Sequence, residues 1–368
     1  MRINWPAALL CSVIVHSCFC ATAWGATDDD EWKKGLRLYK AGKITESIDC
    51  YKLAILANPK HIWAYQDLAN AFRDTGKPGD AVRNYKRAAL VNPNNYWAPW
   101  EIGKILHKSG DIAISIKNYT EAIRRNPKFA WAYFDRGVAY KDVDRTDEAQ
   151  KDFQRCIDID PKYYQARGQL AAILFSQQQW QKAITESTNV INLDRKNFAA
   201  FLNRGECYLM VNKPAQAVAD FSQAIDLKPD SIRSYEGRIN AQERLGEYQK
   251  ACDDISILID IDGDEDGMHF KRAADLVKMK NYDQAFADFN HVIKKNADDD
   301  EAYRRRGDLY YQLGKYDKSI EDYSKALNLD CDSPSAVLTA RSNAYKKMAK
   351  YDLAKRDAQK AQQLKERK

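Results

Sequence analysis

The hydrophobic and polar positions of this chain recur at one fixed interval over most of its length. One amphipathic segment stands at 134–140 (FDRGVAY), 202–208 (LNRGECY), 270–276 (FKRAADL) and 304–310 (RRRGDLY). A second segment follows each of them, at 149–157 (AQKDFQRCI), 217–225 (AVADFSQAI), 285–293 (AFADFNHVI) and 319–327 (SIEDYSKAL). The copies are separated by multiples of 34 residues, which indicates stacked structural units rather than one globular core.

Each 34-residue block is predicted to form two helices joined by a turn, because each half carries an apolar stripe at helical spacing. Counting Asp28 as position 1, nine blocks run without insertion over 28–333, and after Pro334 a tenth block fills 335–368. Position 15, where the first helix needs a left-handed residue to end, is glycine in five blocks: Gly42, Gly76, Gly110, Gly246 and Gly314. Position 32, where the second helix must stop, is proline in five blocks: Pro59, Pro93, Pro127, Pro161 and Pro229.

The block pattern resembles the tetratricopeptide repeat over everything after residue 27. The second block carries the motif in full, with Tyr65, Leu68, Ala69, Phe72, Ala81, Tyr85, Ala88 and Pro93. The resemblance implies an all-α fold, a right-handed superhelical solenoid of helix-turn-helix repeats, in which a small residue at position 8 such as Gly137 lets the two helices approach closely. Two blocks depart from the motif, and we expect softer joints there: the fifth, with Ser187 and Arg195, and the seventh, with Ile239 and Gly263.

The resemblance also implies where a ligand would bind. In this family the first helices line a concave groove with positions 2, 5, 9, 12 and 13. In blocks one to four these positions are aromatic with a few polar neighbours: Trp32, Trp63, Asn70, Trp97, Trp100, Lys104, His107, Trp131 and Phe134. Large aromatic residues are typical of binding hot spots, so we expect a groove that binds a partner. For position 2 the alternative, packing between adjacent repeats, stays open.

Arginine at position 7 and aspartate at position 23 occur in the same six blocks. The pairs are Arg136 and Asp152, Arg204 and Asp220, Arg238 and Asp254, Arg272 and Asp288, Arg306 and Asp322, and Arg341 and Asp357. The other blocks have neither residue; the second, for example, has Leu68 and Asn84. Because positions that vary together usually touch, we predict a shielded ion pair between the two helices of a repeat. The alternative is exposed charges that never meet.

The first 26 residues have the layout of a secretory signal peptide. Arg2 precedes a mostly apolar run, 5–19, and small residues follow at 21–26, where cleavage is expected near Ala23, Gly25 or Ala26. The apolar run is short for a membrane span. The sequence therefore predicts a periplasmic or secreted protein. A lipoprotein variant, with Cys18 as the lipidated residue, is the alternative, and it would anchor the protein to a membrane.

Cysteine usage and net charge add little to this picture. Five cysteines remain after residue 26, at Cys50, Cys156, Cys207, Cys252 and Cys331. They are scattered without CxxC spacing, so buried thiols are expected rather than a disulfide framework. A net charge of +6 in 368 residues does not indicate nucleic-acid binding. The tenth block is basic, and we interpret it as the polar cap of the stack, with an anionic membrane surface as the alternative contact.

No pattern in the chain predicts catalysis or a cofactor. The histidines after residue 26 occupy unrelated repeat positions, and no nucleophile elbow or phosphate-binding glycine loop occurs. One stretch, with Asp262, Asp264 and Asp266, resembles the start of a calcium loop, but Ala273 stands where the bidentate glutamate belongs. An acidic turn that caps the next helix is the preferred interpretation.

These observations predict a non-enzymatic, exported scaffold that binds a protein or peptide segment in its aromatic groove. The alternative is a glycan-binding protein of the cell envelope that uses the same tryptophans as stacking platforms. Sugar binding usually needs carboxylates or amides near the rings. The sequence suggests that the aromatic half is poor in them, which favours a protein partner. The oligomeric state is not predicted.

Overall fold

The computed structural model describes residues 27–263, 265–329 and 331–366, and these ranges contain helices and turns but no strand. The predictions for the leader, including Cys18, concern residues outside the described part of the chain. Within the described part, no helix combines the length and the apolar character that crossing a bilayer requires. The all-helical architecture predicted from the repeat pattern is confirmed.

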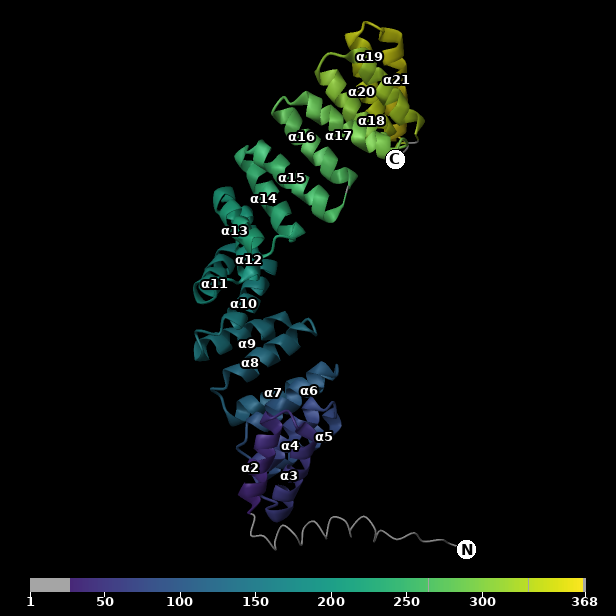
Figure 1. Ribbon diagram of the computed structural model, residues 1–368. Coiled ribbons are helices and arrows are strands. Elements are labelled where there is room, and N and C mark those ends of the chain that lie inside the picture. Colours follow the sequence, from purple (N-terminus) through teal and green to yellow (C-terminus); the bar gives the residue numbers. More distant parts are fainter. Residues whose placement is uncertain (1–26, 264, 330, 367–368) are drawn as a thin grey trace, which may run out of the picture. The chain divides into compact units, whose positions relative to one another are not determined.

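The helices follow one another as pairs along the chain (Figure 1). Their bounds are α2 (Asp28–Lys40), α3 (Ile44–Ala57), α4 (Ile62–Asp74), α5 (Pro78–Val91), α6 (Trp97–Lys108), α7 (Ile112–Arg125), α8 (Ala130–Lys141), α9 (Thr146–Ile159), α10 (Tyr164–Ser176), α11 (Trp180–Leu193), α12 (Phe198–Met210), α13 (Pro214–Leu227), α14 (Ile232–Leu245), α15 (Tyr248–Asp262), α16 (Asp266–Lys278), α17 (Tyr282–Lys295), α18 (Asp300–Gln312), α19 (Tyr316–Asn328), α20 (Pro334–Lys347) and α21 (Tyr351–Glu366).

The chain divides into two compact units, Met1–Ile173 and Leu174–Lys368. The boundary falls inside α10, in the fifth block, which is one of the two blocks that depart from the repeat pattern. In this block Ser187 occupies the position of the usual aromatic residue. Its side chain is buried and its hydroxyl has no hydrogen-bond partner among the described residues.

Within each unit, helices pack in chain order. The two helices of a repeat contact each other, as α4 does with α5, and the second helix contacts the first helix of the next repeat, as α5 does with α6. First helices of neighbouring repeats also touch, for example α6 with α8 in the first unit and α12 with α14 in the second. Each unit is therefore a stack in which a repeat is stabilised mainly by its neighbours.

The centre of a repeat is an aromatic ring of the second helix packed against a small residue of the first. Phe153 of α9 is fully buried, and a Cβ added to Gly137 of α8 would lie 2.8 Å from its ring. The glycine is thus required by a side chain of the facing helix rather than by backbone contact. Burying such a ring contributes roughly 1.5–3 kcal/mol, so this contact is a principal source of stability in the repeat.

The turn between the two helices of a repeat is left-handed in all blocks. The five glycines predicted there have φ between +71° and +86°. In the other five blocks a residue with a side chain adopts the same region, at Asp144, Gln178, Asn212, Lys280 and Ala349. Left-handed backbone costs such residues about 1–2 kcal/mol, so the packing of the two helices imposes this turn even where the sequence does not favour it.

The last position of several blocks caps the first helix of the next one. His61, Asn197, Ser231 and Asp299 each accept a hydrogen bond from the backbone N–H three residues further on. Asn95 does the same before α6, since its Oδ1 accepts from the N–H groups of Trp97 and Ala98 at 3.0 and 3.2 Å. Side chains of this type satisfy the free donors of a helix N-terminus.

Candidate ligand-binding surface

The structure brings all six predicted arginine–aspartate pairs together. In every pair Nε donates to Oδ2 at 2.7–3.1 Å and Nη2 donates to Oδ1 at 2.5–2.9 Å. The aspartate side chains are nearly buried and the arginines are about one-fifth exposed. The hydrogen bonds that Arg204 donates to Asp220 hold the pKa of Arg204 above its ordinary value. This bidentate geometry is the strongest form of ion pair available to these residues.

Each of these arginines also reaches the preceding repeat, which the sequence reasoning missed. Nη1 donates to position 25 of the block before: Thr120, Thr188, Ser222, Ser256, Asn290 and Ser324 accept from Arg136, Arg204, Arg238, Arg272, Arg306 and Arg341. The residue types at position 25 could have predicted these hydrogen bonds. Position 25 is Ser, Thr or Asn only before an arginine-bearing block, and is Lys52, Lys86 or Gln154 elsewhere among the first nine blocks.

The predicted groove tryptophans divide into exposed and buried rings. At position 2, Trp63 of α4 is 60% exposed and Trp131 of α8 is 45% exposed, while Trp97 of α6 is half-buried. Trp97 and Trp131 also contact each other, with centroids 6.0 Å apart. The packing interpretation therefore holds for Trp97 and Trp131, while Trp63 and Trp131 are also exposed to solvent.

At position 5, packing dominates, and the prediction that Trp100 lines an open groove is wrong. Trp100 is only 5% exposed, and its ring is covered by Trp97 at 4.6 Å and by the Lys104 ammonium at 3.7 Å. Its Nε1 donates to Asp135 of the next repeat at 2.6 Å. Trp32 is half-buried and repeats this contact, donating to Asp67 at 2.8 Å. The indole N–H needs an acceptor when it is buried, and the adjacent repeat supplies one.

Phe134 is half-buried as well and packs on the rings of Phe153 and Tyr163 at 5.8 and 5.1 Å. Phe134 therefore serves mainly to pack helices against one another rather than to face a ligand. His107 of α6 has its Nε2 2.7 Å from Oδ2 of Asp142, the residue that follows α8. The exposed aromatic surface of the first unit is thus carried by Trp63 and Trp131, with part of Trp97.

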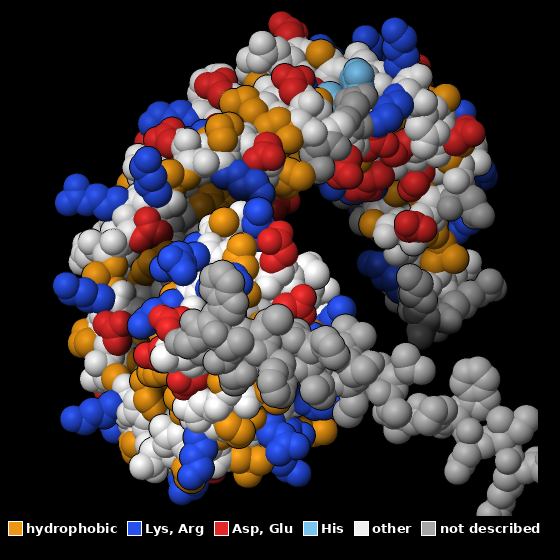
Figure 2. Space-filling model, turned by 60° about the horizontal axis from the view of Figure 1, so that its bottom comes forward, with side chains coloured by type: hydrophobic (Ala, Val, Ile, Leu, Met, Phe, Trp, Pro, Cys, Tyr) orange, Lys and Arg blue, Asp and Glu red, His pale blue; other side chains and the backbone are white. Residues whose placement is uncertain are grey.

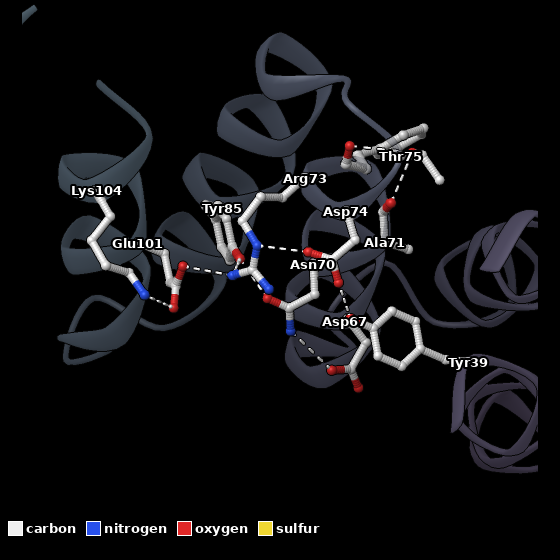
Figure 3. A network of polar contacts seen from close by, with 11 residues as sticks. Tyr39, Asp67, Asn70, Ala71, Arg73, Asp74, Thr75, Tyr85, Glu101 and Lys104 are labelled. Atoms are coloured by element: carbon white, nitrogen blue, oxygen red, sulfur yellow. Dashed lines mark hydrogen bonds and ion pairs between the residues drawn. The ribbon is translucent and has the colours of Figure 1, made fainter. Parts of the chain in front are cut away.

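Asn70 and Lys104 belong to a polar network that links the first three repeats (Figure 3). Its centre is Arg73, which donates to Asp74 at 2.9 Å and to Glu101 at 2.8 Å. Lys104 pairs with the other oxygen of Glu101 at 2.9 Å. At the opposite end Tyr39 donates to Asp74.

The same network orients Asn70. The Tyr85 hydroxyl donates to its Oδ1 at 2.5 Å, and its Nδ2 points to Oδ1 of Asp67 at 3.4 Å (Figure 3). Burial raises the pKa of Asp67, and the hydrogen bonds from Trp32 and Asn70 oppose that shift. These hydrogen bonds fix the orientations of the Asn70 and Asp67 side chains.

A pocket of about 410 Å³ lies beside these two residues. It is formed by α4, the loop between α5 and α6, and the start of α6, and it is lined by Ile62, Trp63, Gln66, Asp67, Asn70, Asn92, Asn94, Asn95, Tyr96 and Trp97. The prediction that the aromatic half is poor in amides and carboxylates is wrong. The loop 92–95 lies far from Trp63 in sequence, and only the packing of α4 against α5 and α6 brings its asparagines to the ring.

The candidate calcium loop lies only partly in the described chain. Asp264 and the side chain of Asp262 are outside it, and Asp266 pairs with Lys295 at 3.1 Å. The predicted cap is absent at the residue that precedes α16, since the Glu265 side chain makes no capping hydrogen bond.

Three other potential metal ligands lie near the first helix. Ligand atoms of Asp28, Asp29 and His61 are within 4.8 Å of one another. Both ring nitrogens of His61 already have neighbours, the N–H of Ala64 at 3.1 Å and Oδ1 of Asp29 at 3.3 Å. The geometry is explained by helix capping, and we assign no ion to it.

The exposed surface mixes charge and apolar character. Figure 2 shows Lys and Arg side chains interspersed with Asp, Glu and hydrophobic side chains over much of the visible face. This distribution matches the small net charge of +6.

Comparison with known proteins supports the same architecture. Sequence models described as TPR repeat or tetratricopeptide repeat match residues 67–113, 103–144, 132–163 and 307–348. No curated protein matches the chain. Among solved structures, the C-terminal part of a TPR repeat-containing protein from Cytophaga hutchinsonii is similar, with 16% identity and a TM-score of 0.53 over 64% of this chain and 97% of that chain.

Two further structures are similar. PilF from Pseudomonas aeruginosa has 16% identity and a TM-score of 0.50, covering 57% of this chain and 95% of that one. A tetratricopeptide repeat protein from Parabacteroides merdae has 17% identity and a TM-score of 0.46, covering 68% and 98%. At these identities the likeness concerns the fold alone.

Helix pairs that recur every 34 residues and pack in chain order define a helical-repeat scaffold, a class whose members generally bind other proteins and are not catalysts. The matched sequence models and the helix pairs of the structure identify this chain, within that class, as a tetratricopeptide-repeat protein.

Proposed function

We propose that this protein is an exported scaffold that binds an extended segment of a partner protein across helices α4, α6 and α8. The observation that carries the proposal is the exposure of Trp63 and Trp131 at the same repeat position of α4 and α8. Solvent-exposed tryptophans on first helices of one stack contribute a large contact area at a small cost in side-chain entropy. The fold class supports a binding role in general.

The polar groups around these rings fit a binding surface better than a reactive centre. Glu101 is saturated by Arg73 and Lys104, and His107 faces Asp142. Groups that are held by one another in this way fix the shape of the surface. They present no nucleophile paired with a general base, which a catalytic site would need.

Selection of a displayed library of unstructured peptides on the full-length protein tests this proposal. We expect enriched peptides whose binding falls at least about tenfold for Trp63→Ala and for Trp131→Ala. The matched control is Leu90→Ala on the second helix α5, where an apolar side chain that is even more exposed than the two tryptophans is removed outside the surface. Enriched peptides that bind all three variants like the unsubstituted protein would place the binding surface elsewhere.

Export is a separate part of the proposal and rests on the predicted leader in 1–26. Expression in a bacterium with an envelope fractionation tests it. We expect the mature protein in the exported fraction, with an N-terminus after Ala23, Gly25 or Ala26 by mass spectrometry. A chain that keeps Met1 and stays in the cytoplasm contradicts export, whereas a lipid-modified N-terminus at Cys18 supports the lipoprotein alternative.

A further inference from the structure

The pocket between Trp63 and Trp97 contains amide groups whose hydrogen-bonding capacity is unused. Gln66 is 7% exposed, and its side-chain amide makes no hydrogen bond to another described residue. Asn95 is 9% exposed, and its Nδ2 is buried without a partner because only its Oδ1 is used for capping α6. Buried polar groups in native proteins are normally paired. Nδ2 of Asn95 is sealed from solvent, so a ligand in the pocket does not reach it. The Gln66 amide lines the pocket and is unpaired within the described chain, which indicates that a ligand supplies its missing partners.

The charges of the residues that line the pocket limit which class of ligand it can bind. No lysine or arginine lines the pocket, and its one carboxylate, Asp67, is already held by Trp32 and Asn70. A phosphate, a sulfate or a free carboxylate would find no cation there. The pocket therefore suits a neutral ligand that both donates and accepts hydrogen bonds, as amide side chains do.

The shape of the pocket and its aromatic wall favour a sugar over a peptide. Trp63 is 60% exposed, so one face of its indole is open, and the apolar face of a pyranose ring can stack on it. The volume of about 410 Å³ is in the range of small-molecule sites, roughly 300–1,000 Å³, rather than of a long channel. Around the ring, Gln66, Asn92 and Asn94 offer planar amides that can bind adjacent hydroxyls.

We propose that this pocket binds a neutral saccharide, with the sugar ring stacked on Trp63 and its hydroxyl groups bound by Gln66, Asn94 and Asp67. The hydrogen bonds among Tyr85, Asn70 and Asp67 support saccharide binding. Tyr85 and Asp67 fix the orientation of Asn70, so the polar wall is formed before the ligand arrives. The site goes beyond the peptide-binding surface proposed above. Trp63 belongs to both sites, but Trp131 does not line the pocket. Trp131→Ala should therefore weaken peptide binding and leave saccharide binding unchanged, which distinguishes the failure of one proposal from the failure of the other.

Calorimetric titration of the full-length protein with short neutral oligosaccharides tests the proposal. The panel contains glucose, xylose, mannose and N-acetylglucosamine oligomers, an oligouronate as the anionic counterpart, and a neutral unstructured peptide. We expect at least one neutral oligosaccharide to bind with a Kd of about 1 mM or tighter. Trp63→Ala and Gln66→Ala should each weaken it at least about tenfold, Trp63→Phe should weaken it less, and Leu90→Ala should have no effect.

Circular dichroism and thermal midpoints check that the variants fold. We expect the Trp63 variants to fold because this side chain is largely exposed. The proposal is overturned if no neutral oligosaccharide in the panel binds or if Trp63→Ala binds as tightly as the unsubstituted protein. Preference for the oligouronate overturns the neutral-ligand argument. Preference for the peptide, lost with Trp63→Ala, assigns the pocket to the peptide-binding surface instead.

Discussion

Arg204 illustrates how a single side chain connects three helices. Its guanidinium donates two hydrogen bonds to Asp220 of α13 in its own repeat and one to Thr188 of α11 in the repeat before. Arginine is suited to this position because its donors are fixed in one plane, whereas a lysine in the same place would be a single point charge. Five further arginines make the corresponding contacts, so the ion pairs tie neighbouring repeats as well as the helices within one.

A double-mutant cycle on Arg204 and Asp220 should show strong coupling. Removing either partner alone leaves the other charge nearly buried, which is expected to lower the free energy of unfolding by about 3–5 kcal/mol. The double variant should cost clearly less than the sum of the two single changes. Urea denaturation measures all three values. If the effects of the two single changes simply add, the two side chains do not interact.

The third hydrogen bond of the arginine predicts a smaller effect between repeats. Thr188→Val keeps the shape of the side chain and removes the acceptor for Nη1 of Arg204, and we expect a loss of about 1 kcal/mol. The change should have little effect in an Arg204→Leu background, because the donor is then absent. An equal loss in both backgrounds would mean that Thr188 acts through its own helix only.

At the scale of single turns, some non-glycine residues adopt left-handed backbone. We predict that replacing them by glycine stabilises the protein. Lys280 has φ +61° and Ala349 has φ +55°. Replacing either by glycine removes strain of about 1 kcal/mol and should raise the thermal midpoint. The reverse change, Gly246→Ala, should lower it by a similar amount, since Gly246 has φ +74°. A decrease for both Lys280→Gly and Ala349→Gly would show that the lost side-chain contacts outweigh the strain.

At the scale of helix pairs, Gly137 and Gly168 should respond in opposite ways to alanine. A Cβ at Gly137 would lie 2.8 Å from the ring of Phe153, so Gly137→Ala forces α8 and α9 apart and should cost about 1–3 kcal/mol. Gly168 in α10 has open space around it, and alanine should stabilise that helix by about 0.5–1 kcal/mol. Denaturant midpoints of the two variants test this. If both variants change stability in the same direction, the space around the added Cβ does not decide the effect.

At the scale of the whole molecule, we predict that the buried thiols make the folded state less stable at alkaline pH. Burial raises the pKa of Cys156, Cys207 and Cys252 from about 9 to about 12. Between about pH 9 and pH 12 the thiols therefore stay protonated in the folded state, whereas they are ionised in the unfolded state. The stabilisation is complete below pH 9 and is lost as the pH rises from about 9 to about 12. The slope of unfolding free energy against pH should become shallower in Cys207→Ala. An unchanged slope would assign the effect to other groups.

Much of the fold and of the structural ion pairs followed from the sequence. The 34-residue period located the helices, the left-handed turns and the six arginine–aspartate pairs, because all of these depend on residues within one repeat or the next. Contacts of such short sequence separation recur whenever the motif recurs. The hydrogen bonds to position 25 were equally local, and their residue pattern was visible in the chain.

Side-chain exposure was decided by the tertiary structure. Trp63 and Trp97 share position 2, yet one is open and the other is half-covered by neighbouring rings. Trp100 was expected on the surface and lies inside, because Asp135 of the following repeat accepts its N–H. The pocket beside Trp63 likewise exists only because the loop 92–95 folds back on α4. The sequence alone determined which residues each repeat contains. Which of those side chains remain accessible to a ligand depends on how adjacent repeats pack, and only the folded stack settles that.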